Sequence, residues 1–194
     1  MNIFNYIIGT STDFRIQLIR WNNKCREYIN TFYSGDIHRI FGTRFGDCVA
    51  KVEALAFSGA NSSSYRGVTD NSGILQAAAI ISIEQIEIEA ELKQGIIIKS
   101  LTNAPWNVIE QPGQDIIYKR KGAATSLIEG IIGESQSSGF GGIVKVLTIE
   151  RAKEFYQNIG FRETDYSREL IVTEYTANTV LSEIKQRRQL QPLD

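Results

Sequence analysis

The sequence contains few of the residues that build metal centres and disulfide frameworks. Among its 194 residues there is one histidine, His38, and only two cysteines, Cys25 and Cys48. A structural zinc site normally takes four Cys or His ligands, so we expect no metal site. The two cysteines can pair only if the fold brings them together, and we expect them to be buried free thiols.

Long apolar runs and prolines are also scarce. No stretch approaches the roughly 20 apolar residues that a membrane-spanning helix needs. The segment Met1–Ile8 lacks the basic start and long apolar core of a signal peptide, and the three prolines argue against a disordered linker. We therefore expect a cytoplasmic protein with no membrane partner.

Neither sign of charge dominates the chain. There are 21 Lys and Arg residues against 22 Asp and Glu, which gives a formal net charge of −1. Because this balance gives no overall attraction to nucleic acid, any basic site must be local. What the sequence does have is a hydrophobic fraction of 42%. That fraction is enough for a packed core, and we expect one domain over residues 1–194.

Hydrophobic periodicity predicts the order of elements along the chain. Helices are predicted at Asp13–Phe32, Ile37–Phe41, Gly122 to about Ser137, Glu150–Asn158 and Asn178 to about Arg188. Strands are predicted at Asn2–Ile8, Val49–Phe57, Ile74–Ile83, Ile86–Leu92, Gly95–Thr102, Ile143–Leu147, Phe161–Glu163 and Leu170–Tyr175, with a long loop over Ser58–Ser72. This order predicts an α+β fold with a mixed, mostly antiparallel central sheet flanked by helices. Residues 1–45 form a helical N-terminal part and residues 176–194 a helical tail.

A basic, glycine-containing segment precedes one predicted helix. It reads Lys119-Arg120-Lys121-Gly122-Ala123-Ala124, and we call it the basic turn. The apolar residues that follow, up to Ile132, lie on one helical face. A helix N-terminus offers unpaired N–H groups and a partial positive charge, so this pattern favours a phosphate site. The alternative is an ordinary surface helix whose entry loop happens to be basic, and the turn alone does not decide between them.

Two further segments give the basic turn a context. Ala152–Phe161 reads Ala-x-x-Phe-Tyr-x-x-x-Gly-Phe, and Leu101–Asn107 closes a predicted strand. Together with the turn, these segments resemble the GNAT acetyltransferase superfamily. In that family the turn begins with Gln or Arg and has Gly three residues later and Gly or Ala five residues later. Lys119 stands at the opening position here, while Gly122 and Ala124 fit. The resemblance covers residues 74–175.

The resemblance implies acetyl-coenzyme A as a co-substrate. In the family the pyrophosphate lies on backbone N–H groups of the turn. The corresponding residues here are Lys119, Arg120, Lys121, Gly122, Ala123 and Ala124. A bulky side chain at Gly122 or Ala124 would hold the backbone away from the phosphate oxygens. The pantetheine arm would meet main-chain groups near Leu101 and Thr102 as an added half-strand.

The same resemblance makes Tyr156 a catalytic residue that protonates the departing coenzyme A thiolate. A phenol with a pKa near 10 can supply a proton to a thiolate of pKa roughly 8.5 while staying neutral at pH 7. The alternative is a core aromatic residue beside Phe155. The general base stays open. The acidic and imidazole candidates, each of which also reads as a surface residue, are Glu53, Glu87, Glu89, Glu91 and His38.

The predicted function is that of an N-acetyltransferase which moves acetyl directly from acetyl-CoA to a primary amine, the acceptor being unspecified. The alternative is a catalytically inactive GNAT-fold binding or regulatory protein. Ile149, where many family members carry Asn, and the long connection over residues 105–119 favour that alternative. A toxin-like enzyme that acts on aminoacyl-tRNA is disfavoured, and nucleic acid is not an expected partner, because the net charge is near zero. A homodimer could cover exposed strand edges.

Overall fold

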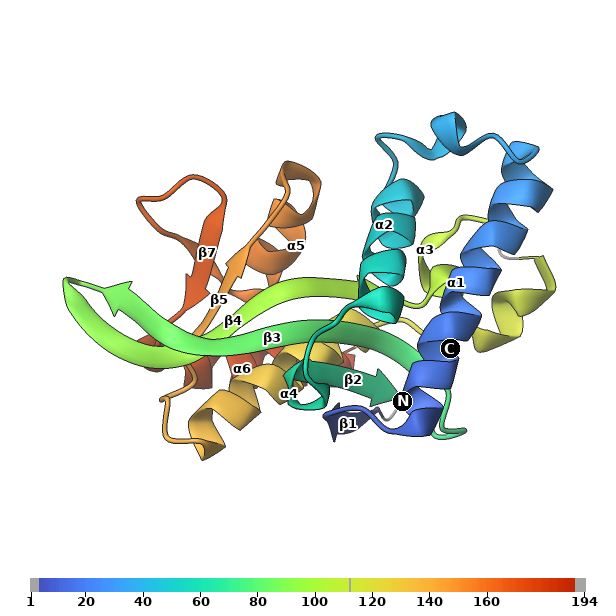
Figure 1. Cartoon of the computed structure of the whole chain (residues 1–194). Helices are drawn as coiled ribbons and strands as arrows, with labels where there is room; N and C mark the ends of the chain where they lie inside the picture. Colours follow the sequence, from blue (N-terminus) through green and yellow to red (C-terminus); the bar gives the residue numbers. More distant parts are fainter. Residues whose placement is uncertain (1–3, 112, 191–194) are drawn as a thin grey trace. The chain divides into compact units, whose positions relative to one another are not determined.

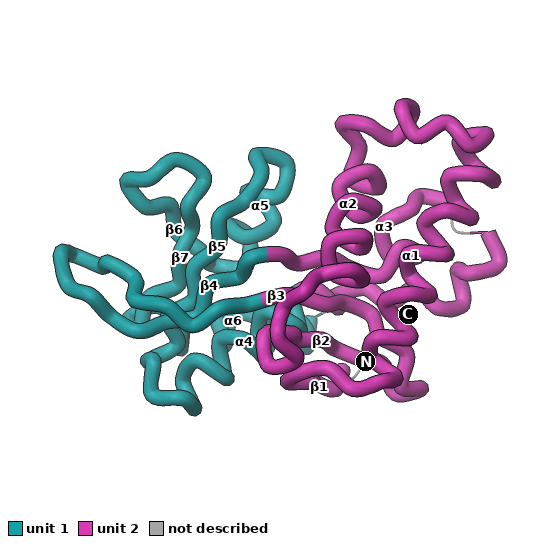
Figure 2. Tube along the Cα trace, in the orientation of Figure 1, with its two compact units in different colours: residues 1, 81–99, 125–194 teal, residues 2–80, 100–124 magenta. Residues whose placement is uncertain are grey.

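The computed structural model describes residues 4–111 and 113–190, and the chain divides into two compact units (Figure 2). We call residues 2–80 with 100–124 the N-terminal unit, and residues 81–99 with 125–194 the C-terminal unit. The two long strands β3 and β4 and the helix α4 each continue from one unit into the other along the chain. Each unit is described by itself below.

Sixteen elements follow one another along the described chain (Figure 1). The strands are β1 (Asn5–Ile8), β2 (Tyr65–Thr69), β3 (Leu75–Ile88), β4 (Glu91–Asn103), β5 (Val144–Leu147), β6 (Arg162–Glu163) and β7 (Glu169–Val172). The α-helices are α1 (Thr12–Tyr33), α2 (Arg44–Phe57), α3 (Pro105–Val108), α4 (Ala123–Ser137), α5 (Glu150–Ile159) and α6 (Glu174–Leu190). The short 3₁₀ helices are η1 (Ile37–Ile40), η2 (Ser62–Ser64) and η3 (Gly113–Tyr118).

The strands form one mixed sheet in the order β1-β2-β3-β4-β5-β7-β6. β1 pairs antiparallel with β2, and β2 with the first part of β3. β4 runs parallel to β5, whereas β5 with β7 and β7 with β6 are antiparallel. The predicted fold class, a mixed and mostly antiparallel sheet with flanking helices, is therefore confirmed.

The N-terminal unit is held together by helices packed through aromatic side chains. The hydroxyl of Ser11 accepts the Phe14 N–H and so begins α1, and Thr43 does the same for α2 by accepting the Gly46 N–H. The helical period of α1 buries one stripe of residues, which includes Trp21. The Trp21 and Trp106 rings meet edge to face with centroids 6.3 Å apart. This packing joins α1 to the segment that follows β4.

The core of the C-terminal unit includes a cluster of isoleucines, and it requires one glycine. Ile86, Ile97, Ile143 and Ile171 pack together there. A Cβ added at Gly95 would lie 2.6 Å from Ile143 and 2.7 Å from Ile86, closer than real side chains approach. Gly95 therefore lets β4 lie against these two isoleucines.

The predicted strand Val49–Phe57 is wrong, because these residues are the second part of α2. The buried residues of that helix are Phe45, Cys48, Val52 and Leu55, whose spacing of three and four is helical. The predicted strand begins at Val49, after the cap at Thr43 and the first buried residue, Phe45. Without these two residues the helical spacing of the buried side chains is hard to recognise.

The central strands are also fewer and longer than predicted. Ile74–Ile83 and Ile86–Leu92 are not separate strands, because β3 runs without a break to Ile88 and the chain reverses at Glu89 and Ala90. Both turn residues have left-handed φ values, 52° and 66°, which two adjacent residues without Gly or Asn seldom adopt. The predicted loop Ser58–Ser72 contains β2, all of which is buried.

The remaining predicted elements are found with small shifts at their ends. The predicted helices at Asp13–Phe32, Gly122–Ser137, Glu150–Asn158 and Asn178–Arg188 correspond to α1, α4, α5 and α6. The short strands that flank α5 are present as β5, β6 and β7. Of the predicted first strand, Asn5–Ile8 is β1, while residues 2 and 3 lie outside the described residues.

Candidate cofactor site

The basic turn leads directly into α4, whose first residue is Ala123. Gly122 has φ +84°, a conformation that residues with a side chain rarely adopt. Among the residues that the structure describes, none beyond the adjoining backbone comes within 4 Å of the position that a Cβ would take there. The backbone of Gly122 is therefore open on the side where a side chain would project. The first N–H groups of a helix such as α4 have no partner within the helix.

Arg120 is held at both its backbone and its side chain. Its N–H donates to Oδ1 of Asn107 at 2.7 Å. Its guanidinium donates to the carbonyl oxygens of Ile117 at 2.8 Å and Lys119 at 3.0 Å, and its Nε lies 3.4 Å from Oδ2 of Asp70. In this structure the Arg120 N–H is already engaged, and a ligand on the turn would meet the residues that follow it.

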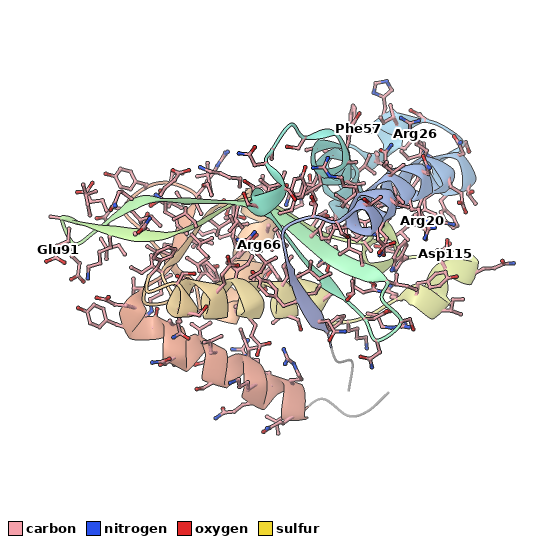
Figure 3. All side chains as sticks on the ribbon, turned by 60° about the horizontal axis from the view of Figure 1, so that its bottom comes forward. Arg20, Arg26, Phe57, Arg66, Glu91 and Asp115 are labelled. Atoms are coloured by element: carbon pink, nitrogen blue, oxygen red, sulfur yellow. The ribbon has the colours of Figure 1, made fainter. Side chains whose placement is uncertain are left out.

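The long connection between β4 and the basic turn folds into α3 and η3, and it is anchored to α1. Oδ2 of Asp115 accepts the Tyr28 hydroxyl at 2.8 Å and lies 3.0 Å from Nζ of Lys24. Figure 3 labels Asp115 on this segment. The Tyr118 ring lies 5.9 Å from that of Trp106. Burial, together with the bond to Asp115, raises the pKa of the Tyr28 phenol, which keeps it protonated as a donor.

Leu101 and Thr102 lie at the end of β4 and are both buried. The next residue, Asn103, accepts a hydrogen bond from the Cys48 thiol at 3.5 Å through its carbonyl oxygen.

Cys25 and Cys48 are buried free thiols, as the sequence predicts. The neighbouring Cys48 thiol, together with burial, raises the pKa of Cys25.

Within the C-terminal unit, the parallel ladder between β4 and β5 is short. It pairs Ile96–Ile98 with Val144–Val146. β4 then continues along the chain to Asn103, whereas β5 ends at Leu147.

Tyr156 lies on α5 in the C-terminal unit and is only 4% exposed. Its ring meets Phe155 and Phe161 edge to face, with centroids 5.1 Å and 5.4 Å away. Burial raises the pKa of the Tyr156 phenol. Its hydroxyl has no hydrogen-bond partner among the residues that the structure describes. Gly160 ends α5 with φ +119°, and a Cβ there would lie 2.7 Å from Val180 of α6. These contacts explain the residue types of the Phe-Tyr-x-x-x-Gly-Phe segment.

The general-base candidates lie on the surface. Glu53 is exposed on α2 and not on a strand. Glu87, Glu89 and Glu91 are exposed around the turn between β3 and β4, where Figure 3 labels Glu91 at the tip. His38 lies on η1 against the Phe41 ring. Burial therefore singles out none of them as a base.

Sequence reasoning missed the polar residues that hold the basic turn. Asp70 and Gln76 are 4% and 0% exposed, and Gln76 lies in the first part of β3, where its neighbours up to Ile81 are apolar. Such a glutamine needs hydrogen-bond partners when buried, and that was the available signal. The basic turn and Leu101–Thr102 belong to the N-terminal unit, and Tyr156 belongs to the C-terminal unit.

The described residues contain neither a metal-binding cluster nor a membrane-spanning helix. Residues 4–111 and 113–190 contain no group of three or more His, Cys, Asp and Glu side chains that could hold a metal ion. No helix in the same ranges is long and apolar enough to cross a membrane.

Comparison with known proteins gives matches only among solved structures. No protein-family model and no curated protein matches the chain. A GNAT-family acetyltransferase from Listeria monocytogenes matches with TM-score 0.48 and 12% identity, over 88% of this chain and 97% of its own. A GCN5-related N-acetyltransferase from Anabaena variabilis matches with TM-score 0.48 and 13% identity, over 84% of this chain. The match spans 32% of that protein.

A third match is a mutant of the toxin AtaT, bound to the C-terminus of the antitoxin AtaR and to acetyl-CoA. Its TM-score is 0.42 and its identity 13%, over 61% of this chain and 72% of that chain. Two of these three structures carry the name of the superfamily that the sequence motifs resemble. The acetyl-CoA and the antitoxin are ligands of AtaT, and the acceptor of the present protein and its relation to nucleic acid stay predictions.

Proposed function

We propose that this protein is an N-acetyltransferase of the GNAT type, which transfers acetyl from acetyl-CoA to a primary amine. The observation that carries the proposal is the basic turn: three cations and an exposed, left-handed Gly122 stand at the start of a 15-residue helix. A turn of this kind offers backbone N–H groups and positive charge to a pyrophosphate, with no side chain in the way. The helix α5 with Tyr156, in the order the family motif requires, supports the same proposal.

The reaction needs few protein groups. The amine nitrogen attacks the thioester carbonyl, the carbon–sulfur bond breaks, and the Tyr156 hydroxyl gives its proton to the leaving thiolate. The amine loses its proton to a base that we leave unassigned. The N–H groups of residues 121–124 would bind the pyrophosphate, and main-chain groups near Leu101 and Thr102 the pantetheine. Acetyl passes directly from sulfur to nitrogen, with no covalent enzyme intermediate.

Calorimetric titration with coenzyme A and acetyl-CoA tests the cofactor site, and the chain offers a matched control. Gly139, at the other end of α4, has φ +83° and, like Gly122, is exposed with nothing within 4 Å of its missing Cβ. Gly122→Leu and Gly139→Leu therefore introduce the same backbone strain. We expect Gly122→Leu to weaken coenzyme A binding at least tenfold while Gly139→Leu binds like the wild type. Equal affinity in both variants would refute the pyrophosphate site.

One observation favours the second candidate function, a binding or regulatory protein without transferase activity. Ile149 stands at the N-cap of α5, where no side chain caps the helix. A polar contact that many family members would make at this position is therefore missing. Acetyl transfer to a panel of primary amines separates the two candidates. Tight coenzyme A binding without transfer to any amine would favour the second one.

A further inference from the structure

Asp70, Gln76, Asn107 and Arg120 form a closed ring of three hydrogen bonds and one ion pair, wholly within the N-terminal unit. Asn107 accepts the Arg120 N–H and donates through Nδ2 to Oε1 of Gln76 at 2.9 Å. Gln76 donates through Nε2 to Oδ2 of Asp70, also at 2.9 Å. The same carboxylate oxygen lies 3.4 Å from Nε of Arg120, which completes the ring.

The ring is anchored to rigid backbone on every side. Oδ1 of Asp70 accepts the N–H groups of Ser72 and Ile74 in the turn between β2 and β3. Gln76 lies inside β3, and its Oε1 also accepts the indole N–H of Trp106 at 3.1 Å. A buried polar network whose members are all bonded is rigid and specifies one arrangement. Residue 120 is thus fixed at its backbone by Asn107 and at its side chain by Asp70.

We infer that Asn107 is a positioning residue for anion binding, which acts through Arg120 to hold the basic turn in its binding conformation. The inference rests on the proposed function, because the anion is the coenzyme A pyrophosphate. Its physical basis is that a ligand binds a mobile turn only in the fraction of molecules where the turn is ordered. When Arg120 is held in place, the N–H groups of residues 121–124 are ordered before the ligand arrives. The affinity is then not reduced by a population of disordered turns. The long connection over residues 105–119 then has a role, since it supplies Asn107.

Three variants test the inference. Asn107→Leu removes the ring at similar volume. Asn107→Asp keeps an oxygen that can accept the Arg120 N–H, but loses the donation to Gln76. Gln17→Leu is the matched control, because Gln17 is another buried amide of the same unit. Its side chain bonds the Leu75 N–H at 2.6 Å, Asp13 at 2.7 Å and the Gly73 carbonyl at 3.1 Å, and among the described residues none of these partners lies in the basic turn.

The first measurement is of backbone order parameters of residues 121–124 by NMR relaxation, without ligand. We expect values near 0.85 in the wild type and in Gln17→Leu, and below about 0.6 in Asn107→Leu. We expect Asn107→Asp to fall between the wild type and Asn107→Leu, because the bond to Arg120 is kept while a carboxylate oxygen faces the two Gln76 oxygens that the amide N–H groups had bonded. Unchanged order parameters in Asn107→Leu would overturn the inference.

The second measurement is of coenzyme A affinity by calorimetry, with urea unfolding of the same variants. We expect Asn107→Leu to bind about tenfold more weakly, as for a turn that is ordered about a tenth of the time. Gln17→Leu, which also loses stability, should bind like the wild type. An equal loss in both variants would overturn the inference. If the wild type binds no coenzyme A, the proposed function fails, and the order parameters still decide whether the ring fixes the turn.

Discussion

At the scale of single residues, Tyr156 is the position where a catalytic and a purely structural role give different results. Tyr156→Phe keeps the ring between Phe155 and Phe161 and removes only the hydroxyl. Because a general acid contributes on the order of 100-fold or more, we expect turnover to fall by about that factor. Coenzyme A affinity should stay the same. The assay is acetyl transfer to an amine found in a screen of primary amines.

The control for this variant is Tyr166→Phe, since Tyr166 is 66% exposed. It should turn over like the wild type. The pH profile adds a second readout. Burial raises the pKa of Tyr156, so its acid form is present at every pH below the ordinary phenol value of about 10. We therefore expect no falling limb from Tyr156 below pH 10. Wild-type turnover in Tyr156→Phe would leave Tyr156 as a core aromatic.

The candidate site could be predicted from the sequence only where residue type itself carries the signal. Gly122 was predicted at the start of a helix, and it has a left-handed φ value. The other ring residues, Asp70, Gln76 and Asn107, were not predicted, because Asn107 is at least 31 residues from the first two and no spacing of the three points to a common site. Their hydrogen bonds exist only once β3, α3 and the basic turn are folded together.

At the scale of elements, the start of α5 can be improved by a single substitution. Ile149 occupies the N-cap, is 40% exposed and offers no acceptor for the first N–H groups of the helix. Ile149→Asn supplies one, and Asn at an N-cap is typically worth about 1 kcal/mol over an apolar residue. We expect the free energy of unfolding to rise by about that amount in urea titrations.

A suitable control is Ile149→Gln, which is polar but caps poorly because its amide is one carbon further from the backbone. An equal gain in both variants would show that removing an exposed apolar side chain, and not the cap, is responsible. If the family's asparagine contact also applies here, Ile149→Asn should in addition tighten coenzyme A binding.

Helices and strands were predictable where the whole repeat of apolar residues lies within one continuous stretch of sequence. The apolar stripes of α1, α4 and α5 each lie within one window of sequence, and all three helices were predicted. α2 was missed because its cap and first buried residue precede the apolar stretch that suggested a strand. The turn at Glu89 and Ala90 was missed because its left-handed residues are of types that rarely adopt that conformation.

At the scale of the whole molecule, each unit carries a buried tyrosine with a raised pKa, which should make folding sensitive to alkali. Tyr28 lies in the N-terminal unit and Tyr156 in the C-terminal unit, and burial raises the pKa of both. Above pH 10 the unfolded chain loses these phenol protons while the folded chain keeps them. The unfolded state then binds fewer protons, so the free energy of unfolding falls as the pH rises. The stabilisation is complete below about pH 10 and is lost towards the raised pKa values.

Urea unfolding between pH 9 and pH 11 measures this loss, at about 1 kcal/mol per tyrosine over the last pH unit. Tyr28→Phe and Tyr156→Phe should each abolish the part of the pH dependence of unfolding free energy that comes from the replaced tyrosine. Tyr166→Phe should leave the pH dependence unchanged. If the two units unfold as one cooperative system, both variants will alter the same transition. If the units unfold separately, each variant will alter only the transition of its own unit. A wild type whose stability is constant from pH 9 to pH 11 would show that both phenols reach solvent in the folded protein.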